Sequence, residues 1–455
     1  MKLSWTKTVF PIAAIFSFRM LGLFFLIPVF SIYAEDLQGS TPALIGFAFG
    51  IYGLAQGLLQ IPFGMLSDKV GRKPIITTGL LLFACGSLIG ALTHSIYGMI
   101  VARALQGTGA IGSVLIALLA DLTPEEQRTK AMAVIGMTIG TSFSLAMVVS
   151  PILTSHFGLA GIFYLTTLLS LFGIILLHCV IPKPLKERFH VDSETNPALL
   201  KHVIFNEQLQ RLNFGIFCQH FILTSTFFVI PFILKKQVEQ GHLTQQWHFY
   251  LPIMLLSFIL MIPFIVLAEK RKKMKGVFLS SVFVIAATQL LFIYTLQNWL
   301  GLCLMMLTYF IAFNILEAAL PSLISKQANP KSKGTAMGIY STSQFLGLFL
   351  GGAFAGLLFQ WNGSQGIFIT NAALGFLWLI IASAMKPNLS ISTLILHYPW
   401  PEKKEDILAR LLNTQGIIEA TLVQEEEAIY LRIDKKHYIA GSAESILMTS
   451  SNRRS

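Results

Sequence analysis

The sequence predicts an all-α membrane protein of twelve transmembrane helices in two six-helix halves, followed by a small α+β domain. Of its 455 residues, 54% are hydrophobic and only 12% are charged, which is too little charge to cover a soluble globule of this length. Apolar runs of about twenty residues recur along the chain, and this is the length a helix needs to cross a bilayer. Segments of the first half also reappear in the second half.

Hydropathy places six spans on each side of a polar stretch. The expected spans are residues 8–33, 42–66, 75–93, 96–121, 130–154, 160–182, 209–235, 246–268, 275–296, 299–325, 334–360 and 364–385. The polar stretch contains "KPLKERFHVDSETNP", whose prolines and charges favour a hinge between the halves. The predicted units are therefore a first bundle at 1–182, a linker at 183–208, a second bundle at 209–386 and a small domain at 389–455.

The positive charges predict the orientation. Lys and Arg follow spans 2, 4, 6, 8 and 10, whereas the opposite loops carry almost no base except Lys235 and Lys236. Basic loops face the cytoplasm, so we expect both chain ends to be cytoplasmic, in the inner membrane of a bacterium. The net charge of +11 then reflects topology, and no nucleic-acid partner is predicted.

An internal repeat supports the division into halves. "IPFGMLSDKVGRKP" (61–74) aligns without gaps on "IPFIVLAEKRKKMK" (262–275), and "KAMAVIG" (130–136) matches "TAMGIYS" (335–341) at nearly the same offset. Two homologous bundles related by an axis along the membrane normal typically build a transporter, with its site between them at mid-depth.

After Lys386 the pattern changes to that of a small folded domain. "ISTLILHYP" alternates like a strand, "PEKKEDILARLLNTQG" is amphipathic, "IIEATLV" and "AIYLRID" flank the acidic turn "QEEE", and "SAESILM" has the character of a short helix. The expected order is βαββα.

Two motifs carry a family resemblance. "GMLSDKVGRK" (64–73) resembles the loop 2–3 signature of the major facilitator superfamily, and "RALQGTG" (103–109) resembles its second motif. The likeness covers all twelve spans. "STSQFLG", "LEAALPSLISK" and the βαββα ending are most similar to the YajR-type subgroup of proton-coupled exporters with a ferredoxin-like C-terminal domain. In span 5, "GTSFSLAMVVSP" departs from the antiporter motif of the superfamily at Ala146 and Ser150, although small residues are retained.

The first motif predicts a conformational latch. Gly64 and Gly71 permit close helix approach and a tight turn. Asp68 can accept hydrogen bonds from the exposed N–H groups that begin span 11 near Gly334. The charges expected to complete this network at the cytoplasmic rim are Arg72, Asp121 and Arg128. Such a latch would stabilise the state open to the outside and break when the cavity opens inward. The alternative, preferred for Lys69 and Lys73, is that the charges fix topology only.

Ionisable residues within spans usually face a cavity or a partner, and spans 1, 4, 7 and 10 line the central cavity in the family. Glu317 is the predicted proton-coupling site, together with Arg19, Arg103 and His220. Three alternatives stay open: Glu317 as a structural acid paired with Arg19, Arg103 as an anchor to span 1, and His220 as a hydrogen-bonded but silent side chain.

Polar amides within spans are the candidates for the substrate cavity. Gln56 and Gln60 share one face of span 2 at i, i+4 spacing, and Gln106 and Asn314 lie in spans 4 and 10. The alternative for Gln56 and Gln60 is that they only hold helices together.

The motifs that are missing restrict the function. No GxxxxGK[ST], HExxH or GxSxG run occurs, and the four cysteines form no CxxC pair, so we expect neither an enzyme nor a cofactor or metal. The sequence predicts a monomeric secondary transporter in the lipid bilayer, exporting a small organic solute in exchange for protons. A facilitator or proton symporter for a polar solute, or a ligand sensor with the C-terminal domain as its output, are the alternatives.

Overall fold

The computed structural model describes residues 5–183, 197–270, 273–296, 298–329, 332–385, 391–397, 404–423, 428–434 and 437–451. Residues 184–196 of the predicted linker and the acidic turn "QEEE" lie outside the described residues, as does the side chain of Arg128.

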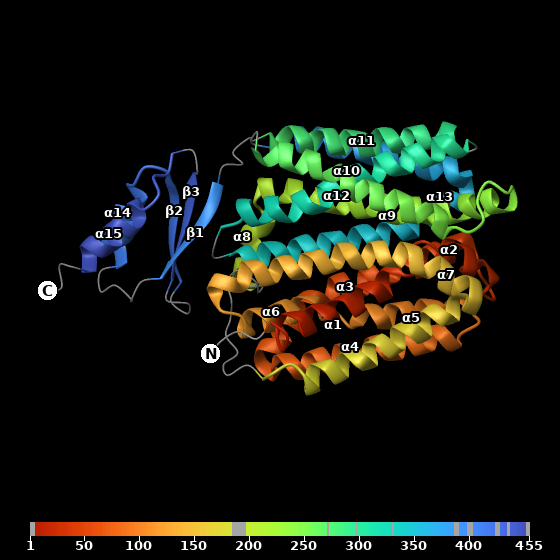
Figure 1. Ribbon diagram of the computed structural model, residues 1–455, viewed down its shortest axis with the longest axis horizontal. Helices are drawn as coiled ribbons and strands as arrows, with labels where there is room; N and C mark the ends of the chain where they lie inside the picture. Colours follow the sequence, from red (N-terminus) through yellow and green to blue (C-terminus); the bar gives the residue numbers. More distant parts are fainter. Residues whose placement is uncertain are drawn as a thin grey trace.

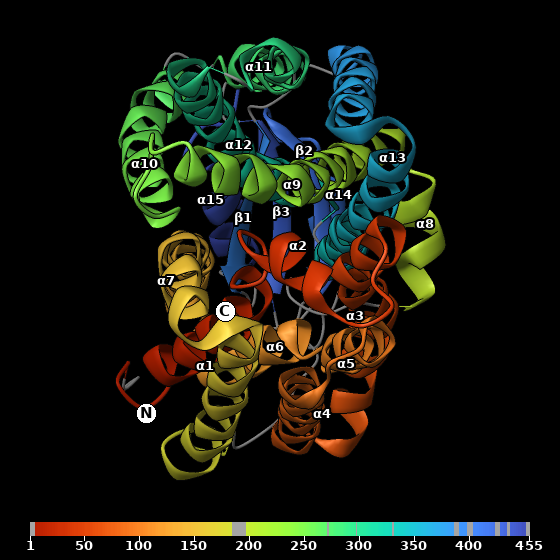
Figure 2. The ribbon, with the colours of Figure 1, turned by 90° about the vertical axis from the view of Figure 1, so that its right-hand side faces the viewer.

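The helices form two groups that lie side by side when viewed along their axes (Figure 2). The first bundle comprises α1 (Val9–Phe24), α2 (Phe30–Tyr33), a 3-10 turn η1 (Ala34–Asp36), α3 (Pro42–Val70), α4 (Arg72–Leu92), α5 (Ile96–Thr108), α6 (Gly112–Leu122) and α7 (Glu125–Cys179). After the short η2 (Pro197–Leu199) and α8 (Leu200–Ile204), the second bundle comprises α9 (Glu207–Glu239), α10 (Trp247–Lys270), α11 (Met274–Thr295), α12 (Trp299–Gln327) and α13 (Lys333–Ser383).

Nine helices of the described chain are long and apolar enough to cross a membrane, and α1 is a shorter apolar helix. Two of the nine, α7 and α13, have 55 and 51 residues and each contains a single non-helical glycine, Gly158 at φ 63° and Gly363 at φ 62°. Only glycine adopts such a conformation readily, so each long helix is two helices joined at a sharp bend. The two glycines are separated by the same distance along the chain as Lys130 and Thr335, so the repeat extends to these bends.

The small domain lies beyond one end of the helical body (Figure 1). It consists of β1 (Ile391–His397), α14 (Lys404–Leu412), β2 (Ile417–Val423), β3 (Ala428–Asp434) and α15 (Ser442–Ser451). Its antiparallel sheet has the order β1-β3-β2, and both helices bury apolar side chains against the sheet.

The domain contacts the end of α12. Arg432 on β3 donates to the carbonyl of Gln327, the last residue of α12, at 3.4 Å, and to Glu419 on β2 at 3.2 Å. Asn329 donates to the same Glu419 carboxylate. An arginine at a helix C-terminus is stabilised by the unpaired carbonyls there. We call this end of the helical body the domain end, and the opposite end the far end.

The two bundles meet backbone to backbone along α3 and α13. A Cβ atom added at Gly46 would lie 2.3 Å from the carbonyl oxygen of Gly352, and one added at Gly50 would lie 2.4 Å from that of Phe349. We call this contact the glycine seam. It begins at Pro42, at the far end, where the Pro42 carbonyl faces Gly356. Nearer the domain end, by contrast, Met65, Leu66 and Val70 of α3 are exposed.

An aromatic cluster closes the middle of the interface. Phe143 of α7 stacks on Phe313 of α12 with ring centroids 6.0 Å apart and meets Phe310 at 6.1 Å. All three side chains are buried. We call these three rings the aromatic plug. The two bundles are therefore in contact from the far end as far as the aromatic plug.

We predict that Gly50→Leu lowers the stability of the purified protein by about 1–3 kcal/mol, because the added side chain forces α3 and α13 apart. Thermal melting in detergent measures the loss, and labelling of a cysteine placed at Leu348 measures opening at the far end. Gly136→Ala is the control, since nothing lies within 4 Å of a Cβ atom there. If Gly50→Leu melted as this control does, the seam would not be closely packed.

Candidate functional site

The predicted coupling acid lies one turn from the aromatic plug, on the domain side of it. Glu317 of α12 follows Phe313 by one helical turn and accepts a hydrogen bond from Nε2 of Gln219 at 2.8 Å. Nε2 of His220 lies 3.9 Å from the same carboxylate oxygen. The Glu317 side chain is 32% exposed and that of His220 is 6% exposed. The Glu317 carboxylate is thus more accessible than the His220 ring of α9.

The hydrogen bonds of His220 define its neutral form. Nδ1 lies 3.3 Å from the carbonyl oxygen of Ile216, which can only accept, so Nδ1 carries the proton. Nε2 then accepts from the amide of Gln344 on α13 at 2.8 Å. In this tautomer the lone pair of Nε2 is occupied by the Gln344 amide, and Nε2 does not donate to the Glu317 oxygen 3.9 Å away.

Arg19 is not part of this cluster. Its side chain is 2% exposed, and it donates to the carbonyl of Gly109 at 3.3 Å and to the side-chain oxygen of Gln56. The helix break between α5 and α6, next to Gly109, lies beside α1 and accepts this guanidinium. The alternative that pairs Glu317 with Arg19 is therefore wrong for this conformation.

The predicted cavity amides serve mainly to join helices. Gln56 donates to Gln60 at 3.3 Å, and the backbone carbonyl of Gln60 accepts from Ser113 at 3.0 Å. Asn314 donates to Ser257 of α10 at 3.1 Å. Gln106 donates to Ser87 of α4 at 2.8 Å. Of the two amides of α3, Gln56 joins helices by accepting from Arg19 of α1, whereas the Gln60 side chain bonds to Gln56 on its own helix and meets Ser113 only through its backbone.

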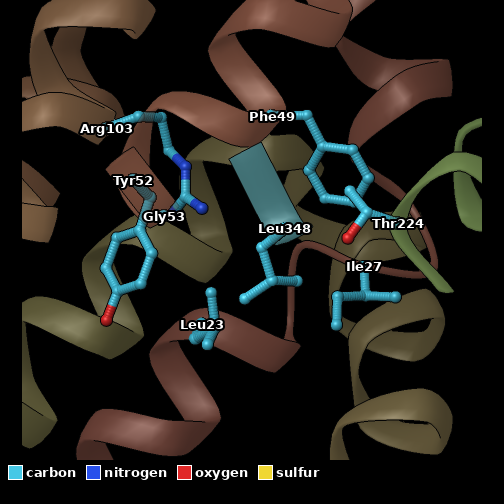
Figure 3. Close-up of a pocket in the computed structure, with 8 residues that line it drawn as sticks. All are labelled: Leu23, Ile27, Phe49, Tyr52, Gly53, Arg103, Thr224 and Leu348. Atoms are coloured by element: carbon cyan, nitrogen blue, oxygen red, sulfur yellow. The ribbon is translucent and has the colours of Figure 1, made fainter. Parts of the chain in front are cut away.

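Arg103 borders a small cavity between the bundles, with its guanidinium pointing in among the other lining residues (Figure 3). Its side chain is 1% exposed. Nη1 donates to Gln106 at 2.7 Å, and the guanidinium lies 4.8 Å from the centre of the Tyr52 ring. The sequence placed its anchor on span 1, whereas these two contacts are to its own helix and to Tyr52 of α3.

The first motif forms a charge cluster inside the first bundle. Nε of Arg72 donates to Asp121 at 3.1 Å, and Nη1 donates to the hydroxyl of Ser67 at 2.7 Å and to the carboxylate of Asp68. The side chains of Arg72 and Asp121 are almost fully buried, and that of Asp68 is 33% exposed. Gly71, at φ 106°, makes the turn that allows α4 to start beside the end of α3.

The expected contact between Asp68 and the helix start near Gly334 is not formed among the described residues. Asp68 pairs with Arg72 instead. The reason is conformational, because the bundles meet along the far half of α3 while its last turn is exposed. A Cβ atom added at Gly64 would lie 3.4 Å from the hydroxyl of Ser113 on α6, an ordinary contact distance, so the close approach expected at Gly64 is not formed in this conformation.

One lysine in each bundle donates hydrogen bonds to the carbonyls at the end of the last helix of that bundle. Nζ of Lys73 donates to the carbonyls of Leu177 and Ile181 at 2.9 and 2.5 Å. Nζ of Lys275 donates to those of Ser383 and Met385 at 2.8 and 2.6 Å. A cation at the unpaired carbonyls of a helix end is stabilising. In the alignment of the two halves, Lys73 is opposite Met274. Lys275, which makes the equivalent contacts, is the next residue.

Span 5 keeps the close packing that its small residues predict. Ala146 and Ser150 are fully buried, and the Ser150 hydroxyl donates to the carbonyl of Phe25, which ends α1. The serine that departs from the motif of the family thus satisfies a carbonyl at the helix end.

Sequence reasoning missed Gln219 and Gln344, which bracket the Glu317 and His220 pair. Gln219 directly precedes His220, and Gln344 lies within "STSQFLG", a segment that carries only the family resemblance in the sequence. Within the described residues, no group of three or more His, Cys, Asp or Glu side chains is arranged to hold a metal.

Two repeated helical bundles with an acid and a histidine between them are typical of a membrane transporter, and the comparisons name its family. The family model of the Major Facilitator Superfamily matches residues 12–352 and 212–393, so the chain belongs to that superfamily. It is an integral membrane transporter, not an enzyme.

The chain is 43% identical to the inner membrane transport protein YajR of Escherichia coli K12 over 93% of each chain. It is 26% identical to multidrug resistance protein 2 of Bacillus subtilis over 86% of this chain and 94% of that one. Among solved structures, the nucleoside transporter NupG matches with a TM-score of 0.65 at 18% identity, over 83% of this chain and 98% of the other. A bacterial homologue of Spinster in an inward-facing, occupied conformation matches with a TM-score of 0.64 at 14% identity, over 83% and 95%.

We predict that Asp121→Asn destabilises the protein by about 3 kcal/mol, because it removes one charge of a buried pair and leaves the Arg72 cation less well compensated. Thermal melting measures the change. The matched control is Glu207→Gln, whose side chain is 83% exposed and lies 3.6 Å from Arg211. Its effect should stay within about 0.5 kcal/mol. Equal losses in the two variants would contradict a structural role for the buried pair.

Proposed function

We propose that the protein is a monomeric secondary transporter of the bacterial inner membrane that exports a small organic solute in exchange for protons by alternating access. The observation that carries this proposal is that Glu317 and His220 lie 3.9 Å apart next to the aromatic plug, on its domain side. A carboxylate at this position can take up a proton from one side of the membrane and release it to the other as the bundles move.

The proposed topology has twelve crossings. The nine apolar helices become twelve when α7 and α13 each count as two and α1 is added. The proposed bundles are residues 1–182 and 209–386, joined by the linker 183–208, and the unit 389–455 is a ferredoxin-like domain. Basic loops place both chain ends and the domain end in the cytoplasm. The described conformation then corresponds to an inward-facing state.

In the proposed cycle, protonation of Glu317 removes a negative charge from the bundle interface. Glu317 takes up the proton while the far end is open, and the neutral acid lets the bundles close there and open at the domain end. The proton is then lost to the cytoplasm and solute replaces it, and the solute-loaded bundles return to the state open at the far end, so that protons and solute move in opposite directions. His220 is the neighbouring acceptor through which the proton can pass, and Arg19 and Arg103 set the positive potential around the path.

The charge cluster is proposed as the latch of the alternate state. Asp68 is the exposed member of the cluster, so it is free to exchange part of its interaction with Arg72 for the N–H groups at the start of α13 when the domain end closes. Arg72 and Asp121 stay buried and hold the turn at Gly71 in place, and Arg128 is expected to join them.

We predict that Glu317→Gln reduces solute-dependent proton flux by about two orders of magnitude, because an amide cannot carry the proton. Proteoliposomes with a trapped pH dye measure this flux while a panel of small organic acids, amines and neutral solutes is added. Glu207→Gln is the control. Counterflow of the same solute should persist in Glu317→Gln, since exchange needs no net proton movement. Full proton flux in Glu317→Gln would remove the coupling assignment, and solute binding without any flux would favour a sensor.

We predict that Asp68→Asn inserts normally and lowers transport about tenfold, because the state closed at the domain end loses a contact of roughly 1–2 kcal/mol. Initial rates in proteoliposomes and cysteine labelling at both ends of the interface measure transport and conformational bias. Unchanged transport with unchanged labelling would refute the latch.

A further inference from the structure

A larger cavity lies within the second bundle, at its domain end. It has a volume of about 110 Å³ and lies between α10, α11 and α12, with Ala268, Met274, Val277 and Ala318 among its lining residues. Every lining residue except Ser322 of α12 is apolar. A cavity of roughly 150 Å³ with such walls stays dry and takes up a benzene ring, so this one suits a hydrocarbon group. We call it the outer groove.

The outer groove is separate from the Glu317 site. Its α12 residues Ile315, Ala318, Ala319 and Ser322 recur at helical spacing and so share one face. At 3.6 residues per turn, the centre of that face is roughly 150° around the axis from Glu317. Glu317 itself contacts Gln219 of α9. The groove is therefore lined by the second bundle alone and opens away from the coupling acid.

The surroundings of the outer groove are those of a surface in contact with lipid. Figures 1 and 2 both show α10 and α11 at the outer edge of the second bundle. Of the nine candidate spans, α10 has the smallest buried share, 22% of its most apolar window. Its exposed side chains Ile262, Val266 and Leu267 are apolar. Ala318, on the wall formed by α12, is also exposed, so a lipid chain can reach the groove from the bilayer.

Positive charge stands at the mouth of the outer groove. Lys270 ends α10 and Lys273 directly precedes α11, and both are exposed. They are close in sequence to Ala268 and Met274, which line the groove. They belong to the run "KRKKMK" (270–275), which has five bases. In the part of the chain that the structure describes, no carboxylate pairs with Lys270 or Lys273.

The internal repeat shows that this charge is treated differently in the two bundles. Arg72 aligns with Lys273, but its guanidinium is buried and paired with Asp68 and with Asp121, the latter near the end of α6. The second bundle has no such acid on its side of the groove, because Glu317 is the only acid between Ile315 and Gln327 of α12. The counterpart of Asp68 is Glu269, whose side chain lies outside the described residues. The basic mouth is therefore open to an anion from outside the chain.

We propose that the outer groove binds an anionic phospholipid from the leaflet at the domain end. One acyl chain lies in the groove against Val277 and Ala318, and the phosphate lies between Lys270 and Lys273. Burial of chain carbons provides most of the affinity. The lysines provide the preference for an anionic headgroup, since each base near the membrane surface attracts anionic lipid by a factor of about five. The inference does not rest on the proposed direction of transport or on proton coupling.

Lipid binding to the full-length protein in mild detergent tests the proposal. The probes are dioleoylphosphatidylglycerol and dioleoylphosphatidylcholine, which have the same chains and differ in net charge. Native mass spectrometry of the delipidated protein measures the affinity of the first lipid bound. Phosphatidylglycerol should bind at least about tenfold more tightly. Glycerol 3-phosphate, which has the phosphate without the chains, should not compete at equal concentration.

Two sets of variants locate the site. The double variant Lys270→Gln with Lys273→Gln should reduce the headgroup preference to within about threefold, and the corresponding double arginine variant should keep it. The matched control is Lys235→Gln with Lys236→Gln, which removes two exposed lysines at the far end of α9 and should keep the full preference.

Filling the groove tests the position of the chain. Ala318→Phe should weaken the binding of both lipids by about tenfold, because the ring occupies the space of the acyl chain. Leu300→Phe is the control, since Leu300 is 65% exposed near the start of α12. If Ala318→Phe is not monodisperse, Ala318→Leu decides in its place.

Four results would each overturn the proposal: equal binding of the two lipids by the unaltered protein, full headgroup preference in the double Gln variant at Lys270 and Lys273, equal loss of preference in the far-end control, or unchanged affinity after the groove is filled. None of them bears on Glu317. Loss of proton flux in Glu317→Gln would likewise leave the lipid preference untouched, so the two proposals fail independently.

Discussion

Backbone atoms of α3 and α13 approach so closely that no side chain larger than hydrogen fits between them at Gly46 and Gly50. Most of the remaining geometry depends on this contact. This contact closes the far end and leaves the last turn of α3 exposed. It also brings Leu348 and Tyr52 together in the lining of the small cavity between the bundles. Since apolar side chains gain little from burial against one another inside a bilayer, close backbone approach is the natural means of joining helices there.

The charges are divided between the bundles. The first contributes buried cations, of which Arg72 is neutralised by Asp68 and Asp121 while Arg19 and Arg103 are not. The second contributes the acid Glu317 with His220. Under the proposed mechanism, this division of charge would make the interface sensitive to protonation, because each proton bound to Glu317 or released from it would change the attraction between the bundles.

The sequence predicted a mostly helical membrane protein, since apolar runs of about twenty residues are a strong signal, whereas the count of twelve spans and the domain boundaries stay predictions. It also identified Glu317, His220 and the Arg72 cluster as charged groups that needed partners. It could not assign those partners. Whether Arg19 reaches Glu317 or a carbonyl at the break after α5 depends on the angle between helices, which hydropathy does not encode. Gln219 and Gln344 were missed for a related reason. Amides commonly join membrane helices, and the spacing of these two gives no sign that one contacts Glu317 and the other His220. Lys73 and Lys275 both bind helix-end carbonyls, although the sequence alignment of the two halves places them one position apart. The position of a helix end can therefore differ by one residue between the halves while the contact is kept.

Arg432, Glu419 and Asn329 tie the small domain to the C-terminal end of α12, and none of these contacts involves the first bundle. The small domain is thus attached to α12, the helix that bears Glu317. Under the proposed mechanism, a tilt of that helix would move the small domain with it, so that protonation of Glu317 would be reported by a displacement outside the bilayer.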